Sequence, residues 1–186
     1  MIILRVIAGK ARGLKLKTIE GNSTRPTKDM VKEALFSILM PYVTDCVFLD
    51  LFAGSGAIGI EALSRGAQNA VFCDQNKECI KIINENIEKA RFKDISTVYN
   101  LDYLKCLERI KNQKFDIIFI DPPYNIGLGL KAIQTISDFD LLMINGVLVF
   151  ETDEIEEVPN EIGLYEKFNT KRYGRNVLNF FKRKGN

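Results

Sequence analysis

The chain has 186 residues, of which 46% are hydrophobic and 27% charged, a composition typical of one folded α/β domain rather than of a disordered or fibrous chain. It contains no histidine, which excludes imidazole bases, His-ligated metals and Ser-His or Cys-His nucleophiles, so we expect no metal in the site. The net charge is only +2, but residues 1–30 carry seven Lys/Arg against two acids and residues 166–186 carry seven against one.

Two basic ends therefore flank an acidic body. This distribution is typical of a protein that binds a polyanion. Solvated terminal charge would produce the same pattern, and the charge alone leaves both interpretations open.

The cysteines and the apolar runs indicate in which cellular compartment the protein is expected. Cys46, Cys73, Cys79 and Cys106 form no C-x-x-C pair and lie in or beside apolar runs, so we expect reduced, buried thiols. The apolar start is short and interrupted by Arg5, and no other run approaches the roughly 20 residues of a bilayer span. We expect a cytoplasmic protein and, since no exposed apolar stripe is evident, a monomer.

The first 45 residues differ from the rest and are expected to form an N-terminal appendage. Residues 2–8 and 14–18 predict two short strands around a glycine-containing turn, which together form a basic hairpin. An apolar pattern with helical spacing then follows Thr27, a candidate N-cap, and Pro41 is expected just after the end of this helix.

From Cys46 onward, apolar strands alternate with amphipathic helices. The predicted strands are residues 47–52, 70–74, 95–99, 115–121 and 142–151. The predicted helices are residues 57–64, 77–91, 103–111 and 128–137. Such alternation predicts a parallel sheet with helices on both faces, closed by a β-hairpin over residues 165–173 and 177–183. Ligands of such sheets bind at the carboxyl ends of the strands.

A glycine-rich turn follows the first of these strands. Gly54, Gly56 and Gly59 satisfy the pattern G-x-G-x-x-G, in which glycines allow a tight turn and a close approach to a ligand. NAD and S-adenosylmethionine are both compatible with this turn. Asp50, just before it, would repel a pyrophosphate and would suit the cationic groups of S-adenosylmethionine, which favours the methyl donor.

Acids also end the next two strands. Asp74 is placed to accept hydrogen bonds from both ribose hydroxyls of a nucleoside, a need that NAD and S-adenosylmethionine share. Asp102 is placed to accept from an adenine amine, or to cap the helix that follows, and the two roles are compatible.

The most informative motif is Asp121-Pro122-Pro123-Tyr124, after the apolar strand 115–120. Two prolines fix the backbone and remove two N–H donors, so nearby carbonyls become rigid acceptors. A plain turn does not require an acid before the prolines or an aromatic residue after them. Because the motif follows the glycine turn and Asp74 along the sequence, it indicates a catalytic site.

These four residues resemble the D/N-P-P-Y/F motif of amino-methyltransferases, and the chain as a whole resembles the RsmD family. The similar segments are residues 5–13, Arg25-Pro26-Thr27, residues 32–36, residues 50–66 and Tyr173-Gly174. Many members carry Phe where this chain has Tyr124, and either ring can stack on a base. The resemblance implies one domain over residues 1–186, with the appendage 1–45 and a catalytic core 46–186. It also implies a Rossmann-like class I S-adenosylmethionine-dependent methyltransferase fold, with a seven-stranded, mostly parallel sheet.

The resemblance implies methylation of the N2 amine of a guanine, of the guanine-966 type, in 16S ribosomal RNA within the small subunit. The guanine is expected to leave its stack and to lie on Tyr124, while Asp121 and the Pro122 carbonyl accept its N2 hydrogens. The expected cofactor-binding residues are Asp50, Phe52, Gly54, Gly56, Asp74, Gln75, Asp102, Tyr103, Arg25 and Thr27. The candidates for RNA phosphates are Arg5, Lys10, Arg12, Arg172 and Arg175.

Three other functions are compatible with part of the sequence. An NAD-linked oxidoreductase would leave residues 121–124 without a role. An RNA-binding module without activity would explain the basic ends but not the acids at three strand ends. An adenine-N6 methyltransferase acting on DNA or RNA fits the Asp-Pro-Pro-Tyr motif equally well, so the choice of guanine rests on the resemblance over the appendage and tail.

Overall fold

A computed structural model describes residues 4–18, 26–123 and 127–185 of the chain. The strands are β1 Val47–Asp50, β2 Asn69–Asp74, β3 Ser96–Asn100, β4 Phe115–Ile120, β5 Leu142–Asp153, β6 Glu161–Ile162, β7 Tyr165–Tyr173 and β8 Asn176–Arg183. The helices are α1 Pro26–Val43, α2 Ala57–Ser64, α3 Lys77–Ala90, the short 3-10 helix η1 Lys93–Ile95, α4 Tyr103–Ile110 and α5 Leu128–Asp138. Among these described helices, none combines the length and the apolar character needed to cross a bilayer.

The strands form one sheet in the order β3-β2-β1-β4-β5-β8-β7-β6. The first five strands are parallel, and β8, β7 and β6 are antiparallel to their neighbours. The described part of the sheet thus has eight strands rather than the expected seven. The additional strand, β6, has two residues and pairs with the start of β7, where Ile162 is opposite Tyr165.

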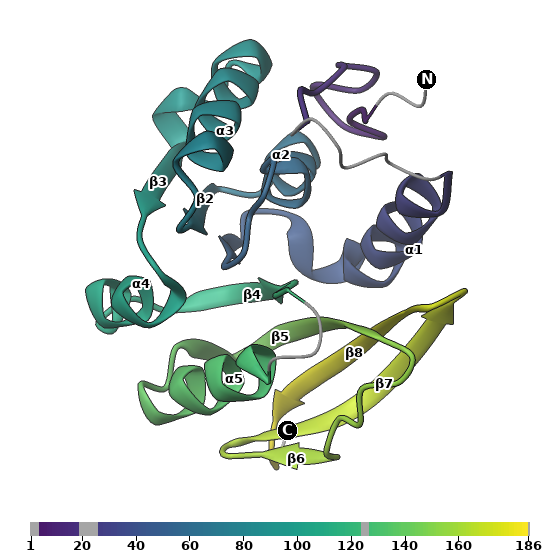
Figure 1. The fold of residues 1–186 in the computed structure, drawn as a ribbon, viewed down its shortest axis with the longest axis vertical. Coiled ribbons are helices and arrows are strands. Elements are labelled where there is room, and N and C mark those ends of the chain that lie inside the picture. The colour runs from purple at the N-terminus through teal and green to yellow at the C-terminus, as the bar shows by residue number, and fades with distance from the viewer. Residues whose placement is uncertain (1–3, 19–25, 124–126, 186) are drawn as a thin grey trace.

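Helices cover both faces of the sheet, as the alternating pattern predicts (Figure 1). On one face, α1, α2 and α3 pack on apolar side chains that include Phe48, Phe72 and Phe119. On the other face, α4 and α5 pack on a second cluster that includes Phe115 and Phe150. The strands are apolar on both faces because both faces are covered.

Helix α1 continues beyond the predicted end. Pro41 lies inside it, and the helix ends at Val43. Proline lacks an N–H donor and crowds the preceding turn, so a helix usually ends before it. Here Pro41 falls in the last turn, and Val43, only 3% exposed, packs in the core, which favours one more turn.

The N-terminal segment is a hairpin with less regular pairing than expected. Within the described residues it contains one β-bridge, between Arg5 and Lys15, flanked by backbone hydrogen bonds such as Val6 N to Leu14 O at 2.9 Å. Backbone N–H groups of the hairpin donate hydrogen bonds to a side chain of α2 and not to another strand. The N–H groups of Ile7 and Ala8 donate to the Glu61 carboxylate.

One buried amide joins the hairpin to the glycine turn. Asn86 on α3 is 0% exposed, and its Oδ1 accepts from Lys17 N at 2.8 Å. Its Nδ2 donates to Lys17 O at 3.0 Å and to Ser55 O at 2.9 Å. The hairpin and the turn after β1 are therefore held by the same side chain.

The hairpin tip lies against the far end of α2. Gly9 has a φ of +79°, and a Cβ there would be 1.8 Å from Ser64 O. Only glycine permits this approach, which brings Lys10 N to 2.8 Å from Ser64 O.

Candidate functional site

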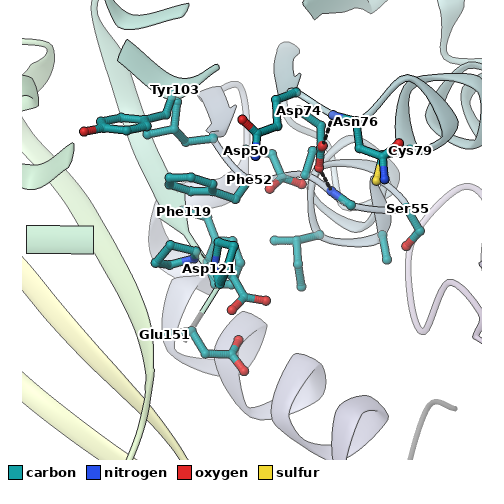
Figure 2. A pocket seen from close by; sticks show the side chains of 18 of the residues that line it. Asp50, Phe52, Ser55, Asp74, Asn76, Cys79, Tyr103, Phe119, Asp121 and Glu151 are labelled. Carbon is teal, nitrogen blue, oxygen red and sulfur yellow. Dashed lines mark hydrogen bonds between the residues drawn. The ribbon is translucent and has the colours of Figure 1, made fainter. Parts of the chain in front are cut away.

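The acids predicted from strand ends meet at one edge of the sheet. Asp50 and Asp74 are the last residues of β1 and β2, and Asp102 and Asp121 follow β3 and β4. Because these strands are parallel and adjacent, their carboxyl ends lie together. Figure 2 shows Asp50, Asp74 and Asp121 around one cavity.

The cavity has a volume of about 780 Å³. The predicted site residues that line it are Asp50, Phe52, Gly54, Asp74, Gln75, Asp102, Tyr103, Asp121 and Pro122. Gly56 does not line it, but has a supporting role. Its φ of +76° starts α2 in the left-handed region, which favours glycine.

Asp50 is buried beneath the glycine turn. It is 1% exposed, and its Oδ2 accepts from Gly59 N at 3.0 Å. Burial raises the pKa of Asp50 to about 7, the bond from Gly59 opposes this shift, and the charge of Asp74 adds to it. A cationic ligand in the cavity would favour the ionised form of Asp50.

Asp74 stabilises the glycine turn by accepting a hydrogen bond from its backbone. Its Oδ2 accepts from Gly54 N at 2.9 Å and its Oδ1 accepts from Asn76 N at 2.8 Å, the two bonds drawn in Figure 2. Each carboxylate oxygen has a second lone pair, so both can also accept from hydroxyl groups of a ligand.

Asp102 caps helix α4. Its Oδ1 accepts from Leu104 N and Lys105 N, both at 3.1 Å. The backbone bond from Lys105 is the main cause that keeps the pKa of Asp102 below its ordinary value. The capping role is therefore present in the structure, and Asp102 still lines the cavity.

Two aromatic rings form one wall of the cavity. The ring centroids of Phe52 and Tyr103 are 5.7 Å apart, with the planes tilted by 32°. Phe52 follows β1 and Tyr103 begins α4. Such a wall offers a flat apolar surface to a planar ring.

The motif after β4 is described as far as Pro123. Asp121, Pro122 and Pro123 line the cavity. Tyr124 and Arg25 lie outside the described residues, and only the helical backbone of Thr27 is described.

A buried lysine that was not predicted from the sequence also lines the cavity. Lys32 on α1 is 3% exposed, and its Nζ is 3.5 Å from Glu61 Oε2 and donates to Arg5 O. Burial lowers the pKa of Lys32, while the charge of Glu61 opposes the shift. Glu61 also binds Arg65 at 2.8 Å, so the acid is shared by two cations.

Glu151 and Asn176 also line the cavity without having been selected. Glu151, on β5, is 9% exposed, and its Oε1 accepts from Asn176 Nδ2 at 2.5 Å. Glu151 is the last residue of the predicted strand 142–151, so the strand-end rule applied to the sequence would have identified it, although β5 continues to Asp153.

The candidate RNA-binding residues do not line this cavity. Lys10 and Arg12, at the hairpin tip, line a second hollow of about 400 Å³ together with Lys89 and Arg91. Arg5 is 3.8 Å from Asp29. Arg172 pairs with Glu154 at 3.3 Å and Arg175 with Asp153 at 3.0 Å, with 61% and 70% of their side chains exposed.

The charge of the cavity limits what it can bind. Its described lining contains five acids and one lysine. The acids are Asp50, Asp74, Asp102, Asp121 and Glu151. This excess of carboxylates disfavours a polyphosphate and favours a ligand with cationic groups and hydrogen-bond donors.

Comparisons with known proteins agree with this architecture. Residues 4–182 match the family model described as Conserved hypothetical protein 95. The chain is 37% identical over 185 residues to the "Putative rRNA methyltransferase YlbH" of Bacillus subtilis, covering 98% of this chain and 100% of that protein. It is 37% identical over 153 residues to the Haemophilus influenzae "Ribosomal RNA small subunit methyltransferase D", covering 81% and 79%.

A solved structure has the same fold over nearly the full length. The "Putative methyltransferase yhhF from Escherichia coli" superposes with a TM-score of 0.87 at 30% identity, covering 98% of each chain. The superposition includes the hairpin and tail as well as the central sheet, because so little of either chain is left out.

Proposed function

The chain belongs to the Conserved hypothetical protein 95 family, the RsmD family, and from this membership we propose that it is an S-adenosylmethionine-dependent methyltransferase acting on the N2 amine of a guanine in 16S ribosomal RNA. The observation that carries the proposal is the convergence of Asp50, Asp74 and Asp121 on one cavity at the carboxyl edge of the sheet. Relatives named as ribosomal RNA methyltransferases support ribosomal RNA as the substrate class.

The cavity fits S-adenosylmethionine by its chemistry. This cofactor supplies an electrophilic methyl group on a sulfonium centre. Asp50 and the turn at Gly54 would hold its cationic part, and Asp74 would accept from its ribose hydroxyls. Phe52 and Tyr103 would pack against its adenine, with Asp102 near the amine.

Asp121 and Pro122 would prepare the amine of the base. The Asp121 carboxylate and the Pro122 carbonyl accept the two N2 hydrogens, which withdraws the nitrogen lone pair from the ring and directs it into the cavity. Positioning of this kind supplies most of the rate enhancement in a transfer between two bound groups. No strong base is needed, because the nitrogen becomes acidic only as it is alkylated, and Asp121 or water then takes the proton. Tyr124 is proposed to stack on the flipped guanine.

The basic ends would hold the RNA. Arg5, Lys10, Arg12, Arg172 and Arg175 are proposed to bind phosphates, which position the substrate without reading its sequence. We propose the small ribosomal subunit as the partner and the guanine-966 type as the target.

The test is nucleoside mass spectrometry after incubation with labelled S-adenosylmethionine and undermethylated small ribosomal subunits, free 16S RNA or DNA. We expect N2-methylguanosine from the subunits. Asp121→Ala should lower turnover at least about 100-fold, comparable to the loss of one preorganised transition-state contact. Asp138→Asn, an exposed acid on α5, is the matched control and should keep full activity. N6-methyladenosine without N2-methylguanosine would overturn the choice of base.

A further inference from the structure

A second carboxylate stands next to Asp121 in the cavity. Ile120 on β4 and Phe150 on β5 are register partners in parallel strands. The residues that follow them, Asp121 and Glu151, therefore lie side by side on one face of the sheet. Figure 2 shows both side chains at the same end of the cavity, away from Asp74 and Asn76.

Glu151 is held in place by a neighbouring strand. Its Oε1 accepts from Asn176 Nδ2 at 2.5 Å, and Asn176 is the first residue of β8, which pairs with β5. The side chain of Glu151 is enclosed, with 9% exposure, yet it lines the cavity. An ionised carboxylate only accepts hydrogen bonds, and one that is buried and oriented discriminates strongly between a donor and an acceptor opposite it.

The two candidate bases differ at the atom next to the amine. Guanine presents N1–H, a donor, beside its N2 amine, whereas adenine presents N1 as an acceptor beside its N6 amine. In the orientation that turns the N1 side of the ring toward β5, a base whose amine binds Asp121 brings its N1 to the adjacent carboxylate of Glu151. Guanine would satisfy Glu151, and adenine would place a lone pair against it.

We propose that Glu151, oriented by Asn176, accepts the N1–H of the target guanine and so selects guanine over adenine. This inference rests on the proposed function and specifies how its substrate is recognised. The order of the three strands β4, β5 and β8 also agrees with the order of groups on the guanine edge. Asp121, Glu151 and Asn176 would face N2, N1–H and O6, since the Asn176 amide has a second N–H to donate.

The competing explanation is that the Glu151–Asn176 bond only ties β5 to β8. Glu151→Gln distinguishes the two, because glutamine has nearly the same shape and its carbonyl can still accept from Asn176. Its amide would then turn a donor toward the base. A merely structural role would leave the preference between bases unchanged.

The experiment uses small ribosomal subunits reconstituted with either guanine or 2-aminopurine at the target position. 2-Aminopurine keeps the amine at C2 but has an unprotonated N1 and no O6, so the change of the ratio in Glu151→Gln, rather than the wild-type ratio itself, tests Glu151. We expect wild-type protein to methylate guanine at least about 100-fold more efficiently, as sites that read a hydrogen bond do. In Glu151→Gln the activity on guanine should fall, and the ratio between the two bases should shrink at least about tenfold, the size expected for one mismatched hydrogen bond.

Controls separate this proposal from the proposed function. Glu157→Gln removes an exposed acid from the segment that follows β5 and should leave the ratio unchanged. Affinity for S-adenosylmethionine and the unfolding midpoint should be the same in wild type and Glu151→Gln. If wild-type protein makes no N2-methylguanosine, the proposed function fails. If it does, and Glu151→Gln loses activity equally on both bases, only the assignment to Glu151 is overturned.

Discussion

Asp74 at the end of β2 accepts a hydrogen bond from the backbone N–H of Gly54 at 2.9 Å, so one strand end holds the turn that follows its neighbour. The other carboxylate oxygen accepts from Asn76 N. The residue proposed to bind the cofactor ribose thus also shapes the glycine turn, which is proposed to hold the cationic part of the cofactor.

Asp74→Asn should weaken cofactor binding. An amide has one acceptor oxygen, so its NH2 group would face either the Gly54 or the Asn76 N–H, and the charge is lost as well. We expect the dissociation constant of S-adenosylmethionine to rise about 10- to 100-fold, the effect of losing one or two charged hydrogen bonds, measured by titration calorimetry. Asp94→Asn, an exposed acid in η1, should bind normally. Unchanged affinity in Asp74→Asn would contradict the ribose assignment.

The pKa of Asp50 predicts a pH dependence of stability. Burial raises this pKa from 3.8 to about 7 in the folded chain. Between these values the folded state holds a proton that the unfolded state has lost, so the free energy of unfolding decreases as pH rises. The contribution is complete below about pH 4 and lost by about pH 7, with a slope of up to about 1.4 kcal/mol per pH unit.

Asp50→Asn cannot ionise and should lack this contribution. The free energy of unfolding of the variant minus that of wild type should therefore be larger at pH 7.5 than at pH 5. Urea unfolding without cofactor at both pH values measures the difference, and Asp94→Asn should follow the wild-type curve. Parallel curves for Asp50→Asn and wild type would show that the buried carboxyl does not titrate in this range.

Two glycines of the hairpin form a matched pair. Gly9 and Gly13 have φ values of +79° and +83°, but a Cβ would meet Ser64 O at Gly9 and nothing within 4 Å at Gly13. Both Ala variants share the backbone strain, so their difference isolates the contact with α2. Gly9→Ala should be less stable than Gly13→Ala by about 1–3 kcal/mol in urea unfolding, the usual cost of overpacking. Equal stability would mean that the hairpin does not dock on α2 in solution.

Arg175 is expected to bind an RNA phosphate. Its side chain is 70% exposed and pairs with Asp153, a surface contact that contributes little to stability. Arg175→Ala should weaken binding to small ribosomal subunits and reduce the salt slope of binding by about one, while affinity for S-adenosylmethionine is unchanged. Arg109→Ala removes an exposed cation from α4 and serves as the control. The same slope in both variants would remove Arg175 from the interface.

The elements around the cavity were predictable because local signals determine them. Apolar strands that end in Asp50, Asp74 and Asp121 place these acids at one edge in any parallel sheet. The glycine turn and the start of α2 follow from backbone requirements, which are also local. The two basic ends and the hairpin were identified by composition and alternation.

Contacts between distant segments were not predictable in the same way. Glu61 interrupts the apolar helix α2, which signals a buried partner, but the sequence does not state that this partner is Lys32 on α1. Asn176 reaches Glu151 only because β8 turns back antiparallel beside β5. Pro41 lies inside α1 because the packing of Val43 outweighs a local preference.

The Asn86 side chain joins the hairpin to the glycine turn and so makes the two segments thermodynamically interdependent. It binds Lys17 in the hairpin and Ser55 in the turn, so a ligand that orders one segment reduces the cost of ordering the other. Such coupling is reciprocal, and each ligand should raise the affinity of the other by the same factor. Asn86→Ala should bring that factor toward one in calorimetric titrations of S-adenosylmethionine with and without bound subunits. The binding of substrate and the binding of cofactor would then be coupled through one side-chain amide that contacts neither ligand.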